Sequence, residues 1–256
     1  MKITVLGSGT YVPQLDKFNS SYLVQIDNEN LLFDFGRGAI NQLLKKGIEY
    51  YDIDKIFITH THADHCSELS SLLHIALAGP YQEKYRTKEL VIYGPKGIKN
   101  TVNHLLEAFN LIKYKPVYEV KIVEIEAGEV IEENNWSIEC FEAFHSESTI
   151  CLSYRIESED KIVSYSGDSG ECEGLRECCK NSDLAIIDAT FTRSNENERH
   201  LNGKMAGKIA KEVGVKMLVL THTGISPEGK FNPLPDAKTF FEGPVVVAED
   251  LIEFDL

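Results

Sequence analysis

The segment Thr59-His60-Thr61-His62-Ala63-Asp64-His65 decides how the rest of this chain is interpreted. It places four potential metal ligands within six residues, after an apolar strand expected at 53–59 and before a helix expected at 64–78. Because His60 and His62 are two residues apart, both can point to the same side of an extended loop. Imidazole and carboxylate groups are ligands that zinc, manganese and iron accept. A solvated loop with incidental histidines is the competing interpretation, but the chain has only 8 histidines in 256 residues.

Three more candidate ligands lie where apolar strands end. His145 follows the apolar stretch 141–144, Asp168 follows 163–167, and His222 follows 218–221. Loops at strand ends are common places for catalytic groups on a rigid scaffold. Each residue alone could be a simple strand-end or capping side chain. Their order after the His60–His65 segment favours a shared metal site.

The pattern around these residues predicts strands and helices in both halves of the chain. Apolar segments at 3–6, 22–26 and 31–35, separated by polar turns, predict antiparallel strands, and a helix at 39–46 ends before Gly47. Further strands are expected at 90–93, 117–125, 136–144, 151–156, 161–165, 184–188, 217–220 and 245–248. Two packed sheets with helices on their outer faces, an α/β architecture, fit this order. Without a linker or a short repeat, we expect a single domain over residues 1–256.

Composition and charge narrow the function classes. Hydrophobic residues make up 43% and charged residues 26%, as in globular proteins. The net charge of −14 (26 basic minus 40 acidic residues) opposes broad, non-specific binding of nucleic acid. No apolar run approaches the roughly 18 residues of a membrane helix, and residues 1–7 predict a strand rather than a signal peptide. We therefore expect a soluble, cytoplasmic protein. Six cysteines without a CxxC pair, three of them at 172, 178 and 179, indicate no disulfide framework.

The complete ligand pattern resembles the metallo-β-lactamase fold hydrolases, in which His-x-His-x-Asp-His is followed by a lone His, an Asp and a lone His. Residues 31–36, Leu-Leu-Phe-Asp-Phe-Gly, are similar to the Asp-bearing strand of that family. The resemblance implies a four-layer αββα sandwich, in which Asp34 accepts backbone N–H groups of the His60–His65 segment. It also implies two divalent metal ions, for which zinc is expected and manganese or iron are alternatives. One ion would be held by His60, His62 and His145 and the other by Asp64, His65 and His222, with Asp168 bridging both.

Within that superfamily the chain is most similar to ribonuclease Z and its short relatives. The similarity lies in residues 6–10, in Gly94-Pro95, and in the segments 165–169 and 187–191. It implies that Asp188, where the family more often has Glu, pairs with His200, and that His200 faces the scissile phosphate. Leu201-Asn202 departs from the family pattern, which has a hydroxyl residue two places after this histidine, and an exposed histidine is the competing interpretation for His200. The family's tRNA-clamping arm has no room here, because His145 and Asp168 are only 168 − 145 = 23 residues apart.

These observations predict a metal-dependent hydrolase of the phosphodiesterase type. The expected substrate is a small or cyclic phosphodiester or an RNA 3′ end, attacked by a hydroxide that bridges the metals. Asp64 would orient that hydroxide, and His200, held by Asp188, would stabilise the phosphate or protonate the leaving oxygen. A small phosphodiester is preferred over tRNA as the partner. A thioester or lactone hydrolase on the same metal site is the alternative function, and the family resemblance also implies a homodimer.

Overall fold

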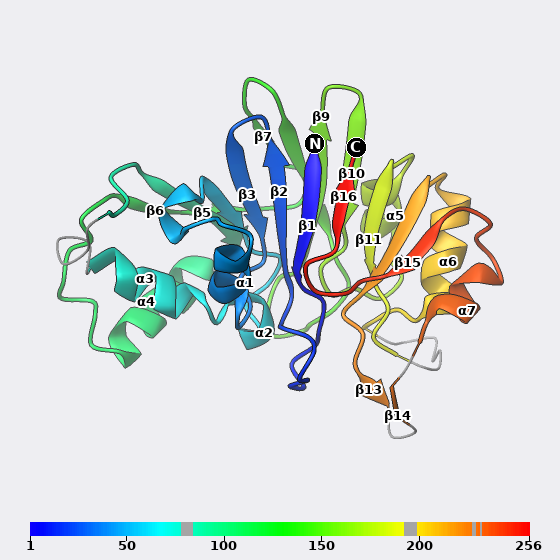
Figure 1. Cartoon of the computed structure of the whole chain (residues 1–256), viewed down its shortest axis with the longest axis horizontal. Coiled ribbons are helices and arrows are strands. Elements are labelled where there is room, and N and C mark those ends of the chain that lie inside the picture. The colour runs from blue at the N-terminus through cyan, green and yellow to red at the C-terminus, as the bar shows by residue number, and fades with distance from the viewer. Residues whose placement is uncertain (78–83, 192–198, 227–228, 231) are drawn as a thin grey trace.

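Two seven-stranded β-sheets pack face to face in the computed structural model of the chain (Figure 1). The structure describes residues 1–77, 84–191, 199–226, 229–230 and 232–256. In sheet order, the first sheet consists of β16 (Glu253–Asp255), β1 (Lys2–Gly7), β2 (Ser21–Ile26), β3 (Glu29–Phe33), β4 (Lys55–Phe57), β5 (Leu90–Pro95) and β6 (Val120–Ile125). The second consists of β15 (Val245–Val247), β12 (Met217–Thr221), β11 (Leu184–Asp188), β10 (Lys161–Tyr165), β9 (Leu152–Ser158), β8 (Ser137–Glu142) and β7 (Val130–Glu132). A separate pair is formed by β13 (Ile225–Ser226) and β14 (Gly229–Lys230).

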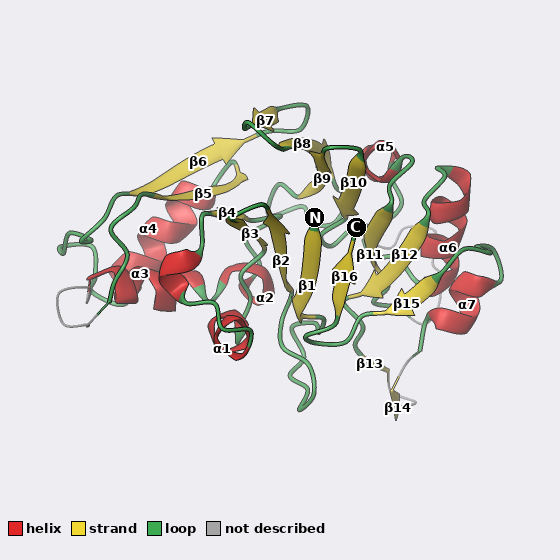
Figure 2. Ribbon diagram, turned by 45° about the horizontal axis from the view of Figure 1, so that its top comes forward, coloured by secondary structure: helices red, strands yellow, loops and turns green. Residues whose placement is uncertain are grey.

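Helices cover the outer faces of both sheets (Figure 2). The first sheet is covered by α1 (Ala39–Lys45), α3 (Leu69–Leu77) and α4 (Ile98–Ala108), and the second by α5 (Glu173–Cys179), α6 (Gly203–Glu212) and α7 (Leu234–Lys238). The short helices η1 (Tyr50–Asp52) and α2 (Ala63–Cys66) lie in connections of the first half. One apolar core lies between the sheets, and one lies under each helical layer. The predicted αββα sandwich is therefore confirmed.

Alternation of side chains along each strand builds these cores. In β3, Leu31 and Phe33 belong to the core between the sheets, whereas Leu32 belongs to the core under the helices. In β11, Ile186 points between the sheets, and Ala185 and Ile187 contact the helical layer. Successive side chains of a strand point to opposite faces of its sheet. Because both faces are covered, these strands are apolar along their whole length rather than at every second residue.

The parallel parts of the two sheets position the chemistry. The strands β3, β4, β5 and β6 run parallel to one another, as do β10, β11, β12 and β15. The carboxyl ends of neighbouring parallel strands meet at one edge of a sheet. Tyr165, at the end of β10, donates its hydroxyl to Asp34 just after β3, so the two edges meet in the middle of the molecule. Polar residues that follow these strands are thereby brought together.

The prediction of one continuous helix at 64–78 is wrong. The segment is divided into α2 and α3, with Ser67 and Glu68 between them, and residue 78 lies outside the described residues. The reason is a pair of backbone hydrogen bonds to Phe35, whose N–H donates to the carbonyl of His65 and whose carbonyl accepts from the N–H of Glu68. A continuous helix would use that carbonyl and that N–H within itself. The division ties the His60–His65 segment to the turn after β3.

Other differences concern the sheet margins. β6 begins at Val120 rather than 117, because the N–H of Val117 donates to the carbonyl of Ala76 in α3 instead of to a strand. The three-residue strands β7 and β16 were not expected from the sequence. None of the helices in the described ranges has the length and apolar character needed to cross a membrane.

Candidate metal centre

Seven polar side chains from both halves of the chain converge where the two sheets meet. His60 and His62 lie in the loop after β4, and Asp64 and His65 belong to α2. The other three follow strands of the second sheet: His145 after β8, Asp168 after β10 and His222 after β12. Their ligand atoms form two groups, each with all atoms within 4.8 Å of one another. Every residue that the sequence suggested as a metal ligand is brought to this place.

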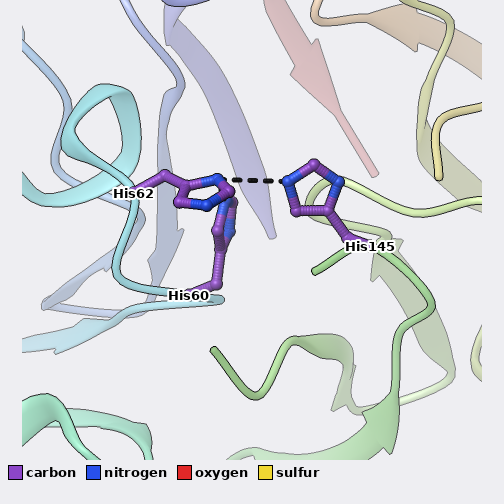
Figure 3. Close-up of side chains that lie close together, drawn as sticks. All are labelled: His60, His62 and His145. Carbon is purple, nitrogen blue, oxygen red and sulfur yellow. Dashed lines mark hydrogen bonds between the residues drawn. The ribbon is translucent and has the colours of Figure 1, made fainter. Parts of the chain in front are cut away.

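The first group consists of three imidazoles, His60, His62 and His145 (Figure 3). His62 Nδ1 lies 3.0 Å from His60 Nε2 and 3.1 Å from His145 Nε2. Burial, together with the neighbouring His65, holds the pKa of His60 well below its ordinary value. Burial also lowers the pKa of His145. Neutral imidazoles offer nitrogen lone pairs, which is the form that binds a metal ion.

The second group combines two carboxylates and two imidazoles. His222 Nε2 lies 3.3 Å from Asp64 Oδ2 and 3.4 Å from Asp168 Oδ1, and His65 Nε2 lies 3.2 Å from the same Asp168 oxygen. The other oxygen of Asp168 lies 3.9 Å from His60 Nε2 and 3.7 Å from His145 Nε2. Asp168 therefore has one carboxylate oxygen toward each group, which is the position that a bridging ligand needs.

Two buried polar atoms show that a cation fits between these residues. His65 Nε2 and Asp168 Oδ1 are buried and have no hydrogen-bond partner among the described residues, although they are 3.2 Å apart. A buried polar atom without a partner is costly, and most such atoms are satisfied. Burial raises the pKa of Asp168, but the imidazoles of His222 and His65 outweigh it and hold that pKa well below its usual range. An ionised carboxylate among imidazoles suits a divalent metal ion.

Asp34 holds the His60–His65 segment in place through hydrogen bonds to Thr59 and His65. Its carboxylate is fully buried and accepts hydrogen bonds from the Thr59 N–H at 2.7 Å, the Tyr165 hydroxyl at 2.7 Å and His65 Nδ1 at 2.6 Å. Because His65 donates through Nδ1, its Nε2 lone pair is left for the ligand group. We expected Asp34 to accept hydrogen bonds from backbone N–H groups of residues 60–65, and these donors are wrong. The only backbone N–H donor to Asp34 among the described residues is Thr59, and the other donors are side chains.

A further acid–imidazole pair stands beside the second group. Asp188, at the end of β11, accepts a 2.6 Å hydrogen bond from His200 Nδ1. Burial alone would lower the pKa of His200, but the Asp188 carboxylate outweighs it and raises that pKa to about 9. The His200 ring lies parallel to that of His222, with 5.5 Å between the ring centres. The structure thus pairs Asp188 with His200 next to the candidate ligands.

His200 lines a surface cavity of about 560 Å³, while Asp188 lies fully buried behind it. The cavity is lined by three imidazoles, His62, His145 and His200, together with Arg199 and the loop 146–148. Arg199 contacts Glu147 and donates to the carbonyl of His145. A molecule in this cavity would contact both the first imidazole group and His200.

Comparison with known proteins places the chain in a family. Residues 29–223 match the model of the beta-lactamase superfamily domain. The chain belongs to the beta-lactamase superfamily. Among curated members, ribonuclease Z of Methanosarcina mazei is 27% identical over 310 residues, covering 100% of this chain and 98% of the relative. Ribonuclease Z of Bacillus mycoides is 28% identical over 315 residues and covers 99% of each.

Solved structures of the superfamily share the fold. The metallo-beta-lactamase fold protein YhfI from Bacillus subtilis has a TM-score of 0.82 at 25% identity, covering 99% of this chain and 98% of that one. The short form of human tRNase Z has a TM-score of 0.78 at 23% identity, covering 100% and 99%. The predicted resemblance to ribonuclease Z-like proteins is confirmed. The chain is a metal-dependent hydrolase of this superfamily.

Sequence reasoning missed Thr190 and Arg199. Thr190 contacts both Asp188 and His222, and Arg199 lines the cavity. A hydroxyl residue two places after a strand-end acid is a weak signal for such a contact, because threonine is common after strands for other reasons. Nothing in the spacing of Arg199 separates it from other surface arginines.

Proposed function

We propose that this protein is a dinuclear phosphodiesterase that acts on small or cyclic phosphodiesters or on RNA 3′ ends. The observation that carries the proposal is the Asp188–His200 pair, which lies beside the ligand groups and in which His200 lines the cavity shared with His62 and His145. Relatives named ribonuclease Z, which cover nearly the whole chain, support phosphodiester chemistry.

Under this proposal the two ligand groups hold one divalent ion each. His60, His62 and His145 would bind one ion, Asp64, His65 and His222 the other, and Asp168 both. We propose zinc, because imidazole-rich sets with carboxylates suit it. When bound, such ions acidify water and neutralise charge on phosphate oxygens.

The remaining roles belong to residues around the cavity and in the second ligand group. The phosphodiester would lie in the cavity that His62, His145 and His200 line, against the His145 and His200 rings, whose centres are 4.5 Å apart. In the metal-free protein Asp188 raises the pKa of His200 to about 9, and its hydrogen bond to His200 Nδ1 would favour the protonated imidazole in the enzyme as well. A protonated imidazole can stabilise negative charge on the phosphate or give its proton to the leaving oxygen. Asp64 belongs to the second ligand group, where its Oδ2 lies 3.3 Å from His222 Nε2. From that position it would orient the attacking water.

A small substrate is favoured over tRNA by what connects His145 to Asp168. Only the β9–β10 hairpin fills this connection. The alignment with the Methanosarcina mazei relative spans 310 positions, so at least 310 − 256 = 54 of them have no residue of this chain. The net charge of −14 also disfavours a polyanionic substrate. The expected homodimer and the cytoplasmic location stay predictions.

The test compares substrates and variants of the metal-loaded protein. Bis-p-nitrophenyl phosphate and a 2′,3′-cyclic nucleotide should be hydrolysed faster than a precursor tRNA, a thioester or a lactone. His200→Ala and Asp188→Ala should each lower diester turnover about 10²–10⁴-fold, the usual range for general acid–base help. Metal content should be unchanged in both. His104→Ala, on an exposed position of α4, is the matched control.

Two results would contradict the proposal. Unchanged diester turnover in His200→Ala would remove the role of that histidine in the reaction. Processing of precursor tRNA as efficient as that of the small diesters would refute the preference for a small substrate.

A further inference from the structure

Thr190 lies where the Asp188–His200 pair meets the second ligand group. It stands two residues after the end of β11. Its hydroxyl oxygen is 2.6 Å from Asp188 Oδ1, 2.7 Å from His222 Nδ1 and 3.0 Å from the carbonyl oxygen of His222. One side chain therefore contacts both the acid of the acid–imidazole pair and a candidate metal ligand.

The hydrogen-bonding capacity of these groups decides where the protons lie. A hydroxyl has one proton to donate and lone pairs to accept with, whereas a carboxylate only accepts. Hydrogen bonds to an ionised acceptor are the stronger ones, so the Thr190 proton points to Asp188. The Thr190 oxygen is then an acceptor for His222, which must carry its proton on Nδ1.

This placement leaves the Nε2 lone pair of His222 for the ligand group. Nε2 lies 3.3 Å from Asp64 Oδ2 and 3.4 Å from Asp168 Oδ1, within the second group. In metal sites, the partner of the non-ligating nitrogen sets the tautomer and the orientation of the ring. His65 receives this support from Asp34, and His222 receives it from Thr190.

The backbone of His222 adopts an uncommon conformation beside Thr190. His222 has a φ of 56°, in the left-handed region that non-glycine residues avoid. Such a conformation persists where surrounding contacts hold it. The hydrogen bond from the Ala189 N–H to the Thr221 carbonyl is one of these contacts.

We propose that Thr190 is a positioning residue that holds His222 in its metal-binding tautomer and orients the Asp188 carboxylate toward His200. The proposal rests on the proposed role of His222 as a metal ligand. The Thr190 hydroxyl connects the Asp188–His200 pair with the second ligand group. A substitution at Thr190 should therefore affect both the pair and His222.

The test removes the hydroxyl while keeping the shape of the side chain. Thr190→Val should weaken zinc binding about 10–100-fold, the usual effect of losing the partner of a ligating histidine. Thr190→Ser, which keeps the hydroxyl, should stay within about threefold of wild type, as should Thr101→Val in α4 as the matched control. Zinc affinity is measured by competition with a chromogenic chelator, which needs no substrate.

A spectroscopic measurement separates positioning from a general loss of packing. The ¹⁵N chemical shifts of His222 in the metal-free protein should show the Nδ1–H tautomer in wild type and Thr190→Ser, and a mixture of tautomers in Thr190→Val. If Thr190→Val does not fold, Thr190→Ala takes its place with the same expected results. In both variants, circular dichroism checks the fold before zinc is added.

The outcomes separate this proposal from the proposed function. Wild-type zinc affinity and an unchanged His222 tautomer in Thr190→Val would overturn the role of Thr190 alone. Unchanged affinity in both Thr190→Val and His222→Ala would overturn the metal-ligand assignment and the role of Thr190 with it. Neither readout depends on which substrate the enzyme hydrolyses.

Discussion

At the scale of single residues, the Asp188–His200 pair should be visible in the titration of the metal-free protein. His200 should titrate with a pKa of about 9, because its ion pair with Asp188 outweighs the effect of burial. An ordinary histidine titrates near about 6.5. Since the folded-state pKa is raised, the pair stabilises the fold fully below about pH 6.5, and this contribution is lost as the pH rises through about 9. NMR titration of chelator-treated protein measures the pKa directly.

Asp188→Asn is the control for this titration. Without the carboxylate, burial dominates, and the His200 pKa should fall below its ordinary value. Denaturant unfolding at pH 6.5 and pH 9.5 should then show less loss of stability in this variant than in wild type. A wild-type His200 that titrates like an exposed histidine would show that the pair does not form.

Asp34 should matter for both stability and metal binding. Asp34→Ala leaves the Thr59 N–H, the Tyr165 hydroxyl and His65 Nδ1 without their acceptor. Each buried group left unpaired costs about 1–3 kcal/mol, so the loss of the acceptor for three groups should lower the free energy of unfolding by at least about 3 kcal/mol. Zinc affinity should fall about 10–100-fold, since His65 loses its orienting partner.

The control for Asp34 is a carboxylate that lies in solvent. Asp160, with a side chain that is 83% exposed, should tolerate Asp160→Ala within about 0.5 kcal/mol. Equal melting temperatures and zinc affinities for Asp34→Ala and wild type would refute a supporting role for Asp34.

The candidate ligands could be predicted from the sequence because their residue types are rare and their positions regular. His145, Asp168 and His222 each follow a recognisable strand. Their division between two ions came from the family resemblance rather than from spacing. The contacts of Thr190 could not be predicted, since they join residues 32 positions apart through a loop geometry that no local pattern records.

At the scale of secondary structure, the turn after β3 should be intolerant of added volume. A Cβ on Gly36 would lie 2.2 Å from the carbonyl oxygen of Asp64 and 2.7 Å from the Asn19 Cβ. Gly36→Ala should therefore push α2 away from this turn, at a cost of about 1–3 kcal/mol for overpacking. Zinc affinity should fall as well, because Asp64 and His65 lie on α2.

Gly224→Ala is the matched control for Gly36→Ala. A Cβ at Gly224 would meet Thr10 at 3.5 Å, an ordinary contact distance, so the melting temperature should change little. If both variants behave like wild type, the close approach between the turn and α2 is not needed to hold the ligands.

The helices and long strands were predictable because their side chains alternate between apolar cores. The break between α2 and α3 was not, because it depends on hydrogen bonds with Phe35, 30 residues before His65. The strands β7 and β16 are three residues long and too short to show a period. Their pairing depends on partners that the rest of the fold supplies.

At the scale of the whole molecule, metal ions should join the two halves of the sandwich. The ligand groups combine residues from the His60–His65 segment with residues that follow strands of the second sheet. A ligand that binds only the folded state stabilises it by about 2.7 kcal/mol at a free concentration 100 times its Kd. Zinc should therefore raise the melting temperature, and a chelator should lower it.

Calorimetry checks this and the proposal that residues 1–256 form a single domain. One transition is expected with and without zinc, because one core lies between the sheets and draws on both. Asp168→Ala should lose most of the zinc-dependent shift, since Asp168 faces both groups. Two separate transitions would contradict the single domain, and a melting temperature insensitive to zinc would contradict the joining role of the ions.

The arrangement of the sheets also bears on how this protein avoids aggregation. An open sheet has two rims at which backbone groups are free to pair with another molecule. Of the four rim strands, β16, β15 and β7 are three residues long, and β6 is the six-residue exception. On β6 the exposed Lys121 forms an ion pair with Glu89 and places a charge on the rim. An uncharged residue at position 121 would remove this charge and leave a longer uninterrupted apolar stretch on the β6 rim. Association of sandwiches into fibres would then begin at β6.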